Sequence, residues 1–218
     1  NDYKFAEQLA IYADYYVNDA FGVSHRAHAS VDAITKYLPS AAGLLLQKEM
    51  KELSKVINPK RPFVCVLGGV KIADKIKIIQ KLAEKADKIL IGGAMANSFM
   101  KAQGRNIGRS KADSIEIAAA IMRKYSAKIV LPQDVVVADE MERPNSVSIV
   151  GAGAVQKNSF IVDIGPLTIA AFGKEIKDAA TIFWNGPLGY FENLKFRKGT
   201  QEVAKQIVST NAIKIVGG

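Results

Sequence analysis

Four short apolar runs of this sequence end in glycine-containing turns. They cover residues 63–67, 88–91, 181–184 and 213–216, and they lead into Gly68-Gly69, Gly92-Gly93, Asn185-Gly186-Pro187 and Gly217-Gly218. Nearly continuous Val, Ile and Leu is typical of strands that are buried on both faces of a parallel sheet. The stretches between the runs carry apolar residues at helical spacing. We therefore predict an α/β fold with a doubly wound parallel sheet, Rossmann-like and three layers deep (α/β/α).

The carboxyl ends of parallel strands lie at one edge of a sheet, which is where such folds bind ligands. Glycine at a strand end lets the backbone pass close to a ligand. One glycine pair is explained by a tight turn. Four glycine-bearing strand ends at the same edge instead predict a cleft of nucleotide size.

Further elements are expected on both sides of these runs. Near the amino terminus we predict a helix at 3–13, a strand at 15–17 and a long helix at 40–57. Beyond residue 70 we predict helices at about 71–86, 94–103, 113–125, 167–177 and 198–209, and strands at 128–131, 135–138, 146–150 and 161–164. The helix at 40–57 is apolar on more than one face at its start, so a domain junction is expected along it.

The stretch from Leu67 to Lys75 offers a site for phosphate. Lys71 and Lys75 lie four residues apart in the first turns of a predicted helix, so they share one face. The free N–H groups of a helix start attract anions. The stretch is neither a Walker A loop nor a G-x-G-x-x-G turn. From this stretch alone, two ordinary surface lysines remain an equal alternative.

A polar loop at residues 24–30 contains both histidines of the chain, His25 and His28, with Arg26 between them. The planar guanidinium of arginine suits carboxylate or phosphate. A metal site at the two histidines is a competing interpretation, but no third ligand lies nearby in the sequence. The third interpretation is a polar loop of structural role only, in which the serines cap turns.

Composition narrows the class of protein. The chain has 218 residues, of which 49% are hydrophobic and 23% charged, enough for one large domain or two small ones. No apolar run reaches the ~18 residues of a membrane span, and no signal peptide is visible. Cys65 is the single cysteine, so no intrachain disulfide forms and the reducing cytoplasm is expected. The net charge of +9 favours anionic partners; the basic residues are scattered among acidic ones, so small phosphorylated ligands are favoured over nucleic acid.

Four groups of residues together resemble the phosphoglycerate kinase family. They are residues 18–22 with 25–30, residues 67–75, residues 91–96 and residues 184–192. Their order and spacing agree over nearly the whole chain, least well at 140–160. The resemblance implies a two-domain, monomeric kinase of glycolysis that closes about a hinge. Such a kinase moves the acyl phosphate of 1,3-bisphosphoglycerate to ADP and releases ATP and 3-phosphoglycerate. It also implies that residues 1–39 belong to a phosphoglycerate-binding domain, 40–58 to the interdomain helix and 59–218 to the nucleotide-binding domain.

The resemblance assigns roles to charged residues. Arg26 would bind phosphoglycerate, Lys71 would hold the phosphoryl group in transfer, and Lys75 would hold the nucleotide phosphates. Asp74 would order this lysine turn. Glu192 would contact the ribose.

Other roles implied by the resemblance fall on glycines and one asparagine. Asn185 would contact the nucleotide, and Gly217-Gly218 would begin a catalytic glycine turn that faces the phosphates. The nucleotide cleft would be lined by Gly69, Gly92, Gly93 and Gly189, with Gly218 at its end.

The sequence departs from the family pattern in several places. The family's principal catalytic arginine would precede Asn1, and the residues that serve Mg²⁺-nucleotide would follow Gly218. We therefore expect a fragment with little turnover, no metal ligand within the chain and Mg²⁺ carried by the nucleotide. Val70, Ala94 and Ile161-Val162 replace the usual alanine, glycine and Gly-Leu, and the last change is expected to narrow the adenine site.

Three alternatives to the kinase remain open. An inactive nucleotide-binding module or paralogue of the same fold is the strongest. A nicotinamide-dependent dehydrogenase would require a G-x-G-x-x-G turn and an acidic residue after the second strand, and neither is present. A basic DNA-binding protein is less consistent still with the scattered charge.

Overall fold

The computed structural model describes residues 2–70 and 76–217. The chain divides into two compact units, Asn1–Asn58 and Pro59–Gly218. Within the described ranges, no helix combines the length and the apolar character that crossing a membrane requires.

The smaller unit contains two helices, two short strands and two 3₁₀ turns. Their order is α1 (Tyr3–Ala10), β1 (Tyr16–Asn18), η1 (Phe21–Val23), η2 (Ala33–Lys36), β2 (Ser40–Ala42) and α2 (Leu44–Ile57). The carboxylate of Asp2 accepts a hydrogen bond from the N–H of Phe5 at 3.1 Å and so caps α1. β1 and β2 pair in parallel, and the small core lies around Ala6, Ala33 and Ile34.

The start of the long helix was predicted wrongly. Residues 40–42 form strand β2, which pairs with β1, and helix α2 begins only at Leu44. The residue before it, Gly43, has an extended backbone, and the carboxylate of Asp19 accepts a hydrogen bond from the N–H of Leu46 at 2.9 Å. This contact from a distant residue fixes the first turn, and the pattern of apolar residues gave no sign of it.

The larger unit is built on a five-stranded parallel sheet. Its order is β10-β9-β3-β4-β5, with β3 at Phe63–Leu67, β4 at Lys88–Ile91, β5 at Ile129–Val130, β9 at Thr181–Asn185 and β10 at Ile213–Gly217. All five residues of the central strand β3 are buried. One of them is Cys65, and burial raises the pKa of its thiol, in keeping with a packing role.

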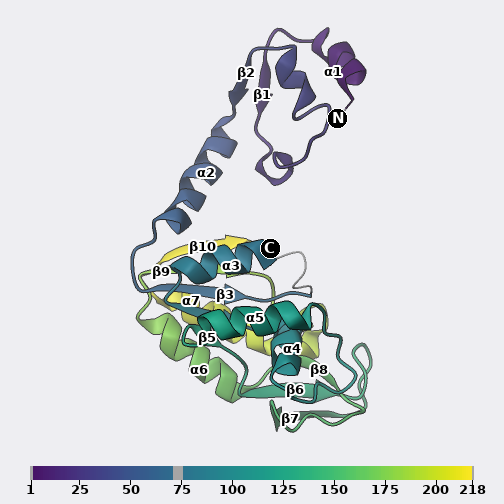
Figure 1. The fold of residues 1–218 in the computed structure, drawn as a ribbon, viewed down its shortest axis with the longest axis vertical. Helices are drawn as coiled ribbons and strands as arrows, with labels where there is room; N and C mark the ends of the chain where they lie inside the picture. Colours follow the sequence, from purple (N-terminus) through teal and green to yellow (C-terminus); the bar gives the residue numbers. More distant parts are fainter. Residues whose placement is uncertain (1, 71–75, 218) are drawn as a thin grey trace. The chain divides into compact units, whose positions relative to one another are not determined.

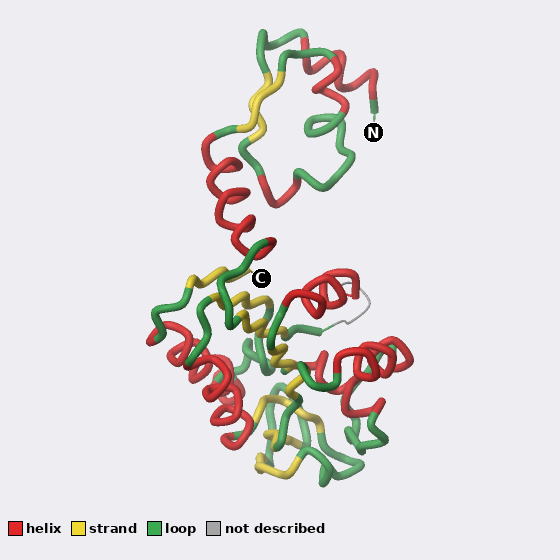
Figure 2. The backbone as a smooth tube through the Cα atoms, turned by 60° about the vertical axis from the view of Figure 1, so that its left-hand side comes forward, coloured by secondary structure: helices red, strands yellow, loops and turns green. Residues whose placement is uncertain are grey.

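Helices cover both faces of this sheet. Figures 1 and 2 show α3 (Ile76–Lys85), α4 (Gly93–Ala102) and α5 (Ile115–Tyr125) on one side, and α6 (Pro166–Lys177) and α7 (Lys198–Ser209) on the other. Phe172 of α6 and Val203 of α7 pack against Val64, Val66 and Ile182 of the sheet. The predicted three-layer α/β fold is confirmed.

A second, antiparallel sheet of three strands was not predicted. It has the order β7-β6-β8, with β6 at Asp134–Ala138, β7 at Val147–Gly151 and β8 at Phe160–Ile164. Only residues 131–133 separate β5 from β6, whereas a crossover between neighbouring parallel strands needs a dozen residues or more. β6 therefore leaves the parallel sheet and forms a layer of its own.

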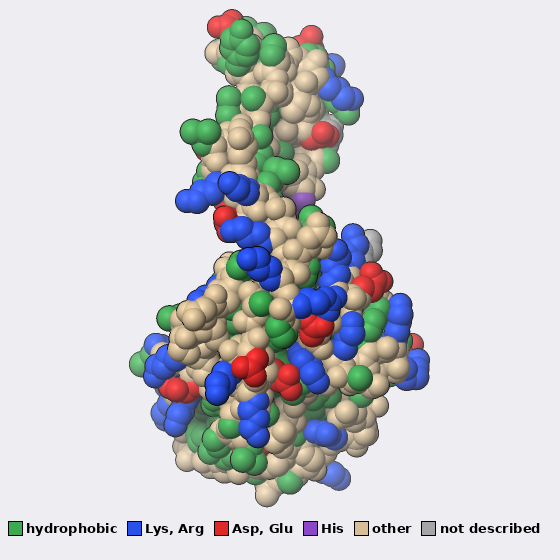
Figure 3. All heavy atoms as spheres, turned by 90° about the vertical axis from the view of Figure 1, so that its left-hand side faces the viewer, with side chains coloured by type: hydrophobic (Ala, Val, Ile, Leu, Met, Phe, Trp, Pro, Cys, Tyr) green, Lys and Arg blue, Asp and Glu red, His purple; other side chains and the backbone are tan. Residues whose placement is uncertain are grey.

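Surface charge is mixed. On the face of the larger unit shown in Figure 3, lysine and arginine side chains lie among aspartate and glutamate. This view is consistent with the scattered charge of the sequence.

Candidate functional site

The glycine-bearing strand ends meet at one edge of the parallel sheet, as predicted. Asn185 at the end of β9 is in register with Leu67 at the end of β3 and with Gly217 at the end of β10. Leu67 is also in register with Ile91 at the end of β4. The turns that follow β3, β4 and β9 are therefore neighbours in space.

These turns are hydrogen-bonded to one another through their backbones. The N–H of Gly69 donates to the carbonyl of Pro187, the N–H of Gly93 donates to the carbonyl of Leu188, and the N–H of Met95 donates to the carbonyl of Gly69, each at 2.9 Å. A Cβ at Gly93 would lie 2.7 Å from the Pro187 carbonyl oxygen. The glycines thus allow the turns to touch each other, and these N–H groups are already used within the protein.

An apolar pocket of about 330 Å³ opens beside these turns. Its walls come from the turns, from one side of α4 and from strand β8 of the antiparallel sheet. They include Ala96, Met100, Phe160, Ile161, Val162, Pro187, Leu188 and Tyr190. This volume and this mostly apolar lining are typical of a site for a small organic ligand.

Four residues expected in the nucleotide cleft line this pocket: Gly69, Gly93, Gly189 and Glu192. They come from three separate turns of the sequence. The Glu192 side chain is exposed, so its carboxylate is accessible to a ligand.

Three other expected residues share the sheet edge without lining the pocket. Gly92 is buried, and a Cβ there would lie 2.6 Å from the side chain of Leu188. Asn185 donates a hydrogen bond from Nδ2 to the carbonyl of Gly217 at 3.0 Å. Both contacts hold the turns and strand ends together.

Five expected residues remain. Lys71, Asp74, Lys75 and Gly218 are outside the described residues, so their roles stay predictions. Arg26 belongs to the smaller unit and is exposed, as are His25 and His28. Among residues 2–70 and 76–217, no group of three or more His, Cys, Asp or Glu side chains is placed to hold a metal ion.

Asp163 forms part of the pocket wall and ties β8 to helix α7. Its carboxylate accepts hydrogen bonds from the N–H of Gly199 at 2.7 Å and from the N–H of Ile164 at 2.9 Å. Burial raises the pKa of Asp163 to about 6, an effect larger than the opposing one of the two N–H donors. A Cβ at Gly189 would lie 2.3 Å from its Oδ1, so glycine is required there by packing.

Sequence reasoning missed the pocket residues that come from helix interiors and loops. Asn97, Arg109, Lys111 and Met141 line the pocket, and no motif pointed to them. One signal was available for Asn97, because it stands with Ser98 as a polar pair between the apolar residues 94–96 and 99–100 of the helix. Arg109 and Lys111 lay in a stretch expected only to connect two helices.

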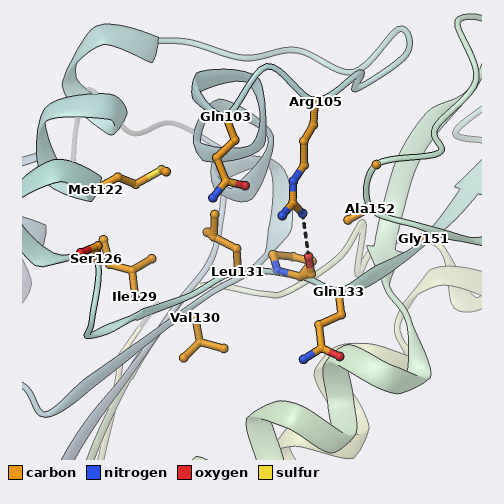
Figure 4. A pocket seen from close by; sticks show the side chains of 12 residues that line it. Gln103, Arg105, Met122, Ser126, Ile129, Val130, Leu131, Gln133, Gly151 and Ala152 are labelled. Carbon is orange, nitrogen blue, oxygen red and sulfur yellow. Dashed lines mark hydrogen bonds between the residues drawn. The ribbon is translucent and has the colours of Figure 1, made fainter.

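A second hollow of about 640 Å³ contains none of the expected site residues. It is bounded by Gln103, Arg105, Met122 and Gln133 and by the turn at 151–153. Figure 4 shows the Arg105 guanidinium directed at the carbonyl of Pro132, to which Nη1 donates at 3.3 Å. The hollow is lined by β5 and by no residue of the turns that follow β3, β4 and β9, so the smaller pocket is the candidate site.

Known proteins resemble the chain over its whole length. The family model described as "Phosphoglycerate kinase" matches residues 1–218. The phosphoglycerate kinase of Finegoldia magna is 47% identical over the whole chain, and that of Koribacter versatilis is 48% identical. The structure of phosphoglycerate kinase from Coxiella burnetii superposes on the whole chain with a TM-score of 0.89 at 38% identity. The chain spans 57%, 56% and 58% of these three proteins, respectively. With a family match over its full length and relatives at this level of identity, the chain belongs to the phosphoglycerate kinase family.

Proposed function

We propose that the larger unit binds ADP and ATP, with the nucleoside in the apolar pocket and the phosphates toward the glycine turns. The observation that carries this proposal is the convergence of Gly69, Gly93, Gly189 and Glu192, from three turns, on one pocket. The position at the carboxyl ends of parallel strands supports it. The Glu192 carboxylate would accept hydrogen bonds from the ribose hydroxyls.

We further propose that the protein transfers the acyl phosphate of 1,3-bisphosphoglycerate to ADP, in the reversible reaction of its family. Phosphoryl transfer depends mainly on positioning and on neutralising charge. Lys71 would neutralise the phosphoryl group in transfer and Lys75 the nucleotide phosphates, while Arg26 of the smaller unit would bind the phosphoglycerate. The Mg²⁺ of this reaction would arrive bound to the nucleotide, as the family implies.

The chain by itself is expected to turn over slowly or not at all. It spans less than two thirds of its relatives, and the further arginine and the Mg²⁺-nucleotide turn that the family resemblance implies are not among its residues. A monomeric state, closure about a hinge at 40–58 and a cytoplasmic location are parts of the same proposal. The alternative is a nucleotide-binding protein without catalysis.

Titration calorimetry with ADP tests the nucleotide site. Glu192→Ala should weaken ADP binding roughly tenfold, because a hydrogen bond to a charged group is worth about 1.5 kcal/mol or more. Glu116→Ala, an exposed carboxylate in the first turn of α5 and outside the pocket, is the matched control and should leave binding unchanged. Equal ADP affinity in both variants would contradict the proposed ribose contact.

A coupled assay of ATP formation tests the reaction. The purified chain should form little ATP from 1,3-bisphosphoglycerate and ADP, and substantial turnover would contradict the expected dependence on further residues. In a protein that does turn over, Lys71→Ala should reduce turnover far more than ADP affinity. If a longer protein that contains this chain, of the length of its relatives, bound ADP without any turnover, the non-catalytic alternative would be supported.

A further inference from the structure

Asn97 presents an unused hydrogen-bond acceptor at the pocket. It lies on α4, lines the pocket and is only 2% exposed. Its Nδ2 donates to the carbonyl of Lys111 at 3.2 Å, whereas its Oδ1 has no hydrogen-bond partner among residues 2–70 and 76–217. Because the Lys111 carbonyl can only accept, the amide nitrogen must face it and the oxygen is the atom left over. A buried acceptor without a partner costs free energy, so this oxygen calls for a donor from outside the protein.

The position of Asn97 along α4 indicates which part of a ligand it meets. The pocket-lining residues of α4 run from Gly93, beside the glycine turns, to Met100. At a rise of 1.5 Å per residue, this stretch covers about 10 Å, and Asn97 lies about 6 Å from its start. If the phosphates lie at the glycine end, the deeper part of the pocket around Asn97 and Met100 receives the base.

We propose that Asn97 Oδ1 accepts a hydrogen bond from the exocyclic amino group of the base and so makes the pocket selective for 6-aminopurines over 6-oxopurines. This inference rests on the proposed function, since it requires that the pocket hold the nucleoside of ADP. Asn97 would then be a specificity-determining residue.

The selectivity follows from the donors and acceptors available. Adenine carries an amino group at position 6, whereas hypoxanthine carries a carbonyl oxygen there. With the 6-oxo base, two acceptors would face each other at a side chain that is only 2% exposed. Turning the carboxamide over would direct Nδ2 at the base but set Oδ1 against the Lys111 carbonyl. Either arrangement loses a hydrogen bond, and sites built around such a bond reject analogues that cannot make it.

Titration of ADP and of inosine diphosphate into the chain tests this inference. The wild-type chain should bind ADP roughly tenfold more tightly than inosine diphosphate. Asn97→Leu is similar in size and has no acceptor, so it should weaken ADP binding and bring the ratio of the two affinities close to one. Asn97→Ala should do the same with a smaller side chain. Asn158→Leu, an exposed asparagine outside the pocket, is the control and should keep the wild-type ratio.

The ratio of the two affinities separates base recognition from a general loss of structure, because a loosened fold would weaken the binding of both nucleotides by the same factor. Equal affinities of the wild-type chain for both nucleotides would overturn the inference and leave the nucleotide site standing. A preference that survives in both Asn97 variants would overturn it too. Binding of neither nucleotide would contradict the proposed function itself, and this inference with it. The wild-type comparison requires no variant, so the test holds even if a variant fails to fold.

Discussion

At the scale of single residues, aspartates from distant parts of the chain cap helices that have a glycine immediately before or within their first turn. Among the described residues, Asp19 accepts from the N–H of Leu46 in α2, Asp134 accepts from the N–H groups of Leu167 and Thr168 in α6, and Asp163 accepts from the N–H of Gly199 in α7. A Cβ at Gly43, Gly165 or Gly199 would lie 2.3 Å from an atom of the aspartate concerned. Glycine offers no capping side chain of its own, but it leaves room for a carboxylate from elsewhere. Each pair therefore fixes a helix start and joins two segments of the chain.

Removal of the Asp134 carboxylate tests the strength of this arrangement. Asp134 is 3% exposed, and its Oδ1 and Oδ2 accept from the N–H groups of Thr168 and Leu167 at 2.8 and 3.0 Å. Asp134→Ala leaves these donors without partners and should lower the free energy of unfolding by about 3 kcal/mol. Urea denaturation followed by circular dichroism measures the change. Asp178→Ala, at the exposed end of the same helix, should change it by less than about 0.5 kcal/mol; similar effects of the two substitutions would show that the cap is unimportant.

The titration of Asp163 gives a prediction with a definite sign. Its pKa is raised from 3.8 to about 6 in the folded protein by burial, so the folded state keeps the proton over a pH range in which the unfolded state has lost it. The free energy of unfolding should therefore fall as pH rises from about 4 to about 6, by about 3 kcal/mol at 1.36 kcal/mol per pKa unit.

Asp163→Asn should remove this part of the pH dependence, because the amide does not titrate. Urea denaturation of both proteins between pH 4 and pH 7 isolates the contribution of Asp163 as the difference between the two curves, since the other titrating groups are common to both. Parallel curves would contradict a raised pKa at this site.

At the scale of elements, the turns after β3, β4 and β9 act as one hydrogen-bonded group. The sequence was sufficient to predict that these turns would meet, because the carboxyl ends of neighbouring parallel strands share an edge. It was not sufficient to predict that Gly69 and Gly93 would donate their N–H groups to carbonyls of the neighbouring turn. Such contacts depend on the distance between backbones, which no local pattern encodes. The role of these glycines is therefore partly to let the turns pack together.

Gly93→Ala tests the close packing of these turns. Gly93 has φ of +62°, and an added Cβ would lie 2.7 Å from the Pro187 carbonyl oxygen. Gly104 has φ of +77° with nothing within 4 Å of an added Cβ, so Gly104→Ala is a control that carries the backbone strain alone. We expect Gly104→Ala to lower the free energy of unfolding by about 1 kcal/mol and Gly93→Ala to lower it by about 2 kcal/mol more. Urea denaturation measures both changes. Equal costs would mean that the turns can move apart freely.

The antiparallel sheet marks the limit of prediction from periodicity. The run at 135–138 is as apolar as the strands of the parallel sheet, so its composition gave no reason to separate it. The informative feature was the length of the connection, because residues 131–133 are too few for a parallel crossover. The helix start at Leu44 was missed for a different reason, since the Asp19 carboxylate that caps the helix lies 27 residues before its partner Leu46 in the sequence. Both errors concern contacts between elements, whereas the elements of the large parallel sheet were recognised from local pattern.

At the scale of the whole molecule, the candidate site was predictable where it depends on turns and not where it depends on helix interiors. Gly69, Gly93, Gly189 and Glu192 converge on the pocket, while Asn97 was hidden inside a helix. A polar side chain on a buried helix face can be recognised as part of a site only when the opposite wall of the pocket is known. Here that wall comes from β8, whose placement in a separate sheet was not predicted.

The last prediction concerns the independence of the larger unit. Its core contains buried residues of β3, β4, β9, α6 and α7, all within Pro59–Gly218, and the candidate pocket is lined entirely by residues of the same unit. Residues 59–218 expressed alone should therefore unfold in one cooperative transition and bind ADP with a Kd within about twofold of the whole chain, since the groups proposed to contact the nucleotide are retained. Thermal denaturation and titration calorimetry provide the two measurements, and Glu192→Ala in the shorter protein should weaken ADP binding by the same factor as in the longer one. A tenfold loss of ADP affinity in the folded shorter protein would show that residues 1–58 contribute to the nucleotide site. The proposal that the larger unit alone binds the nucleotide would then be wrong.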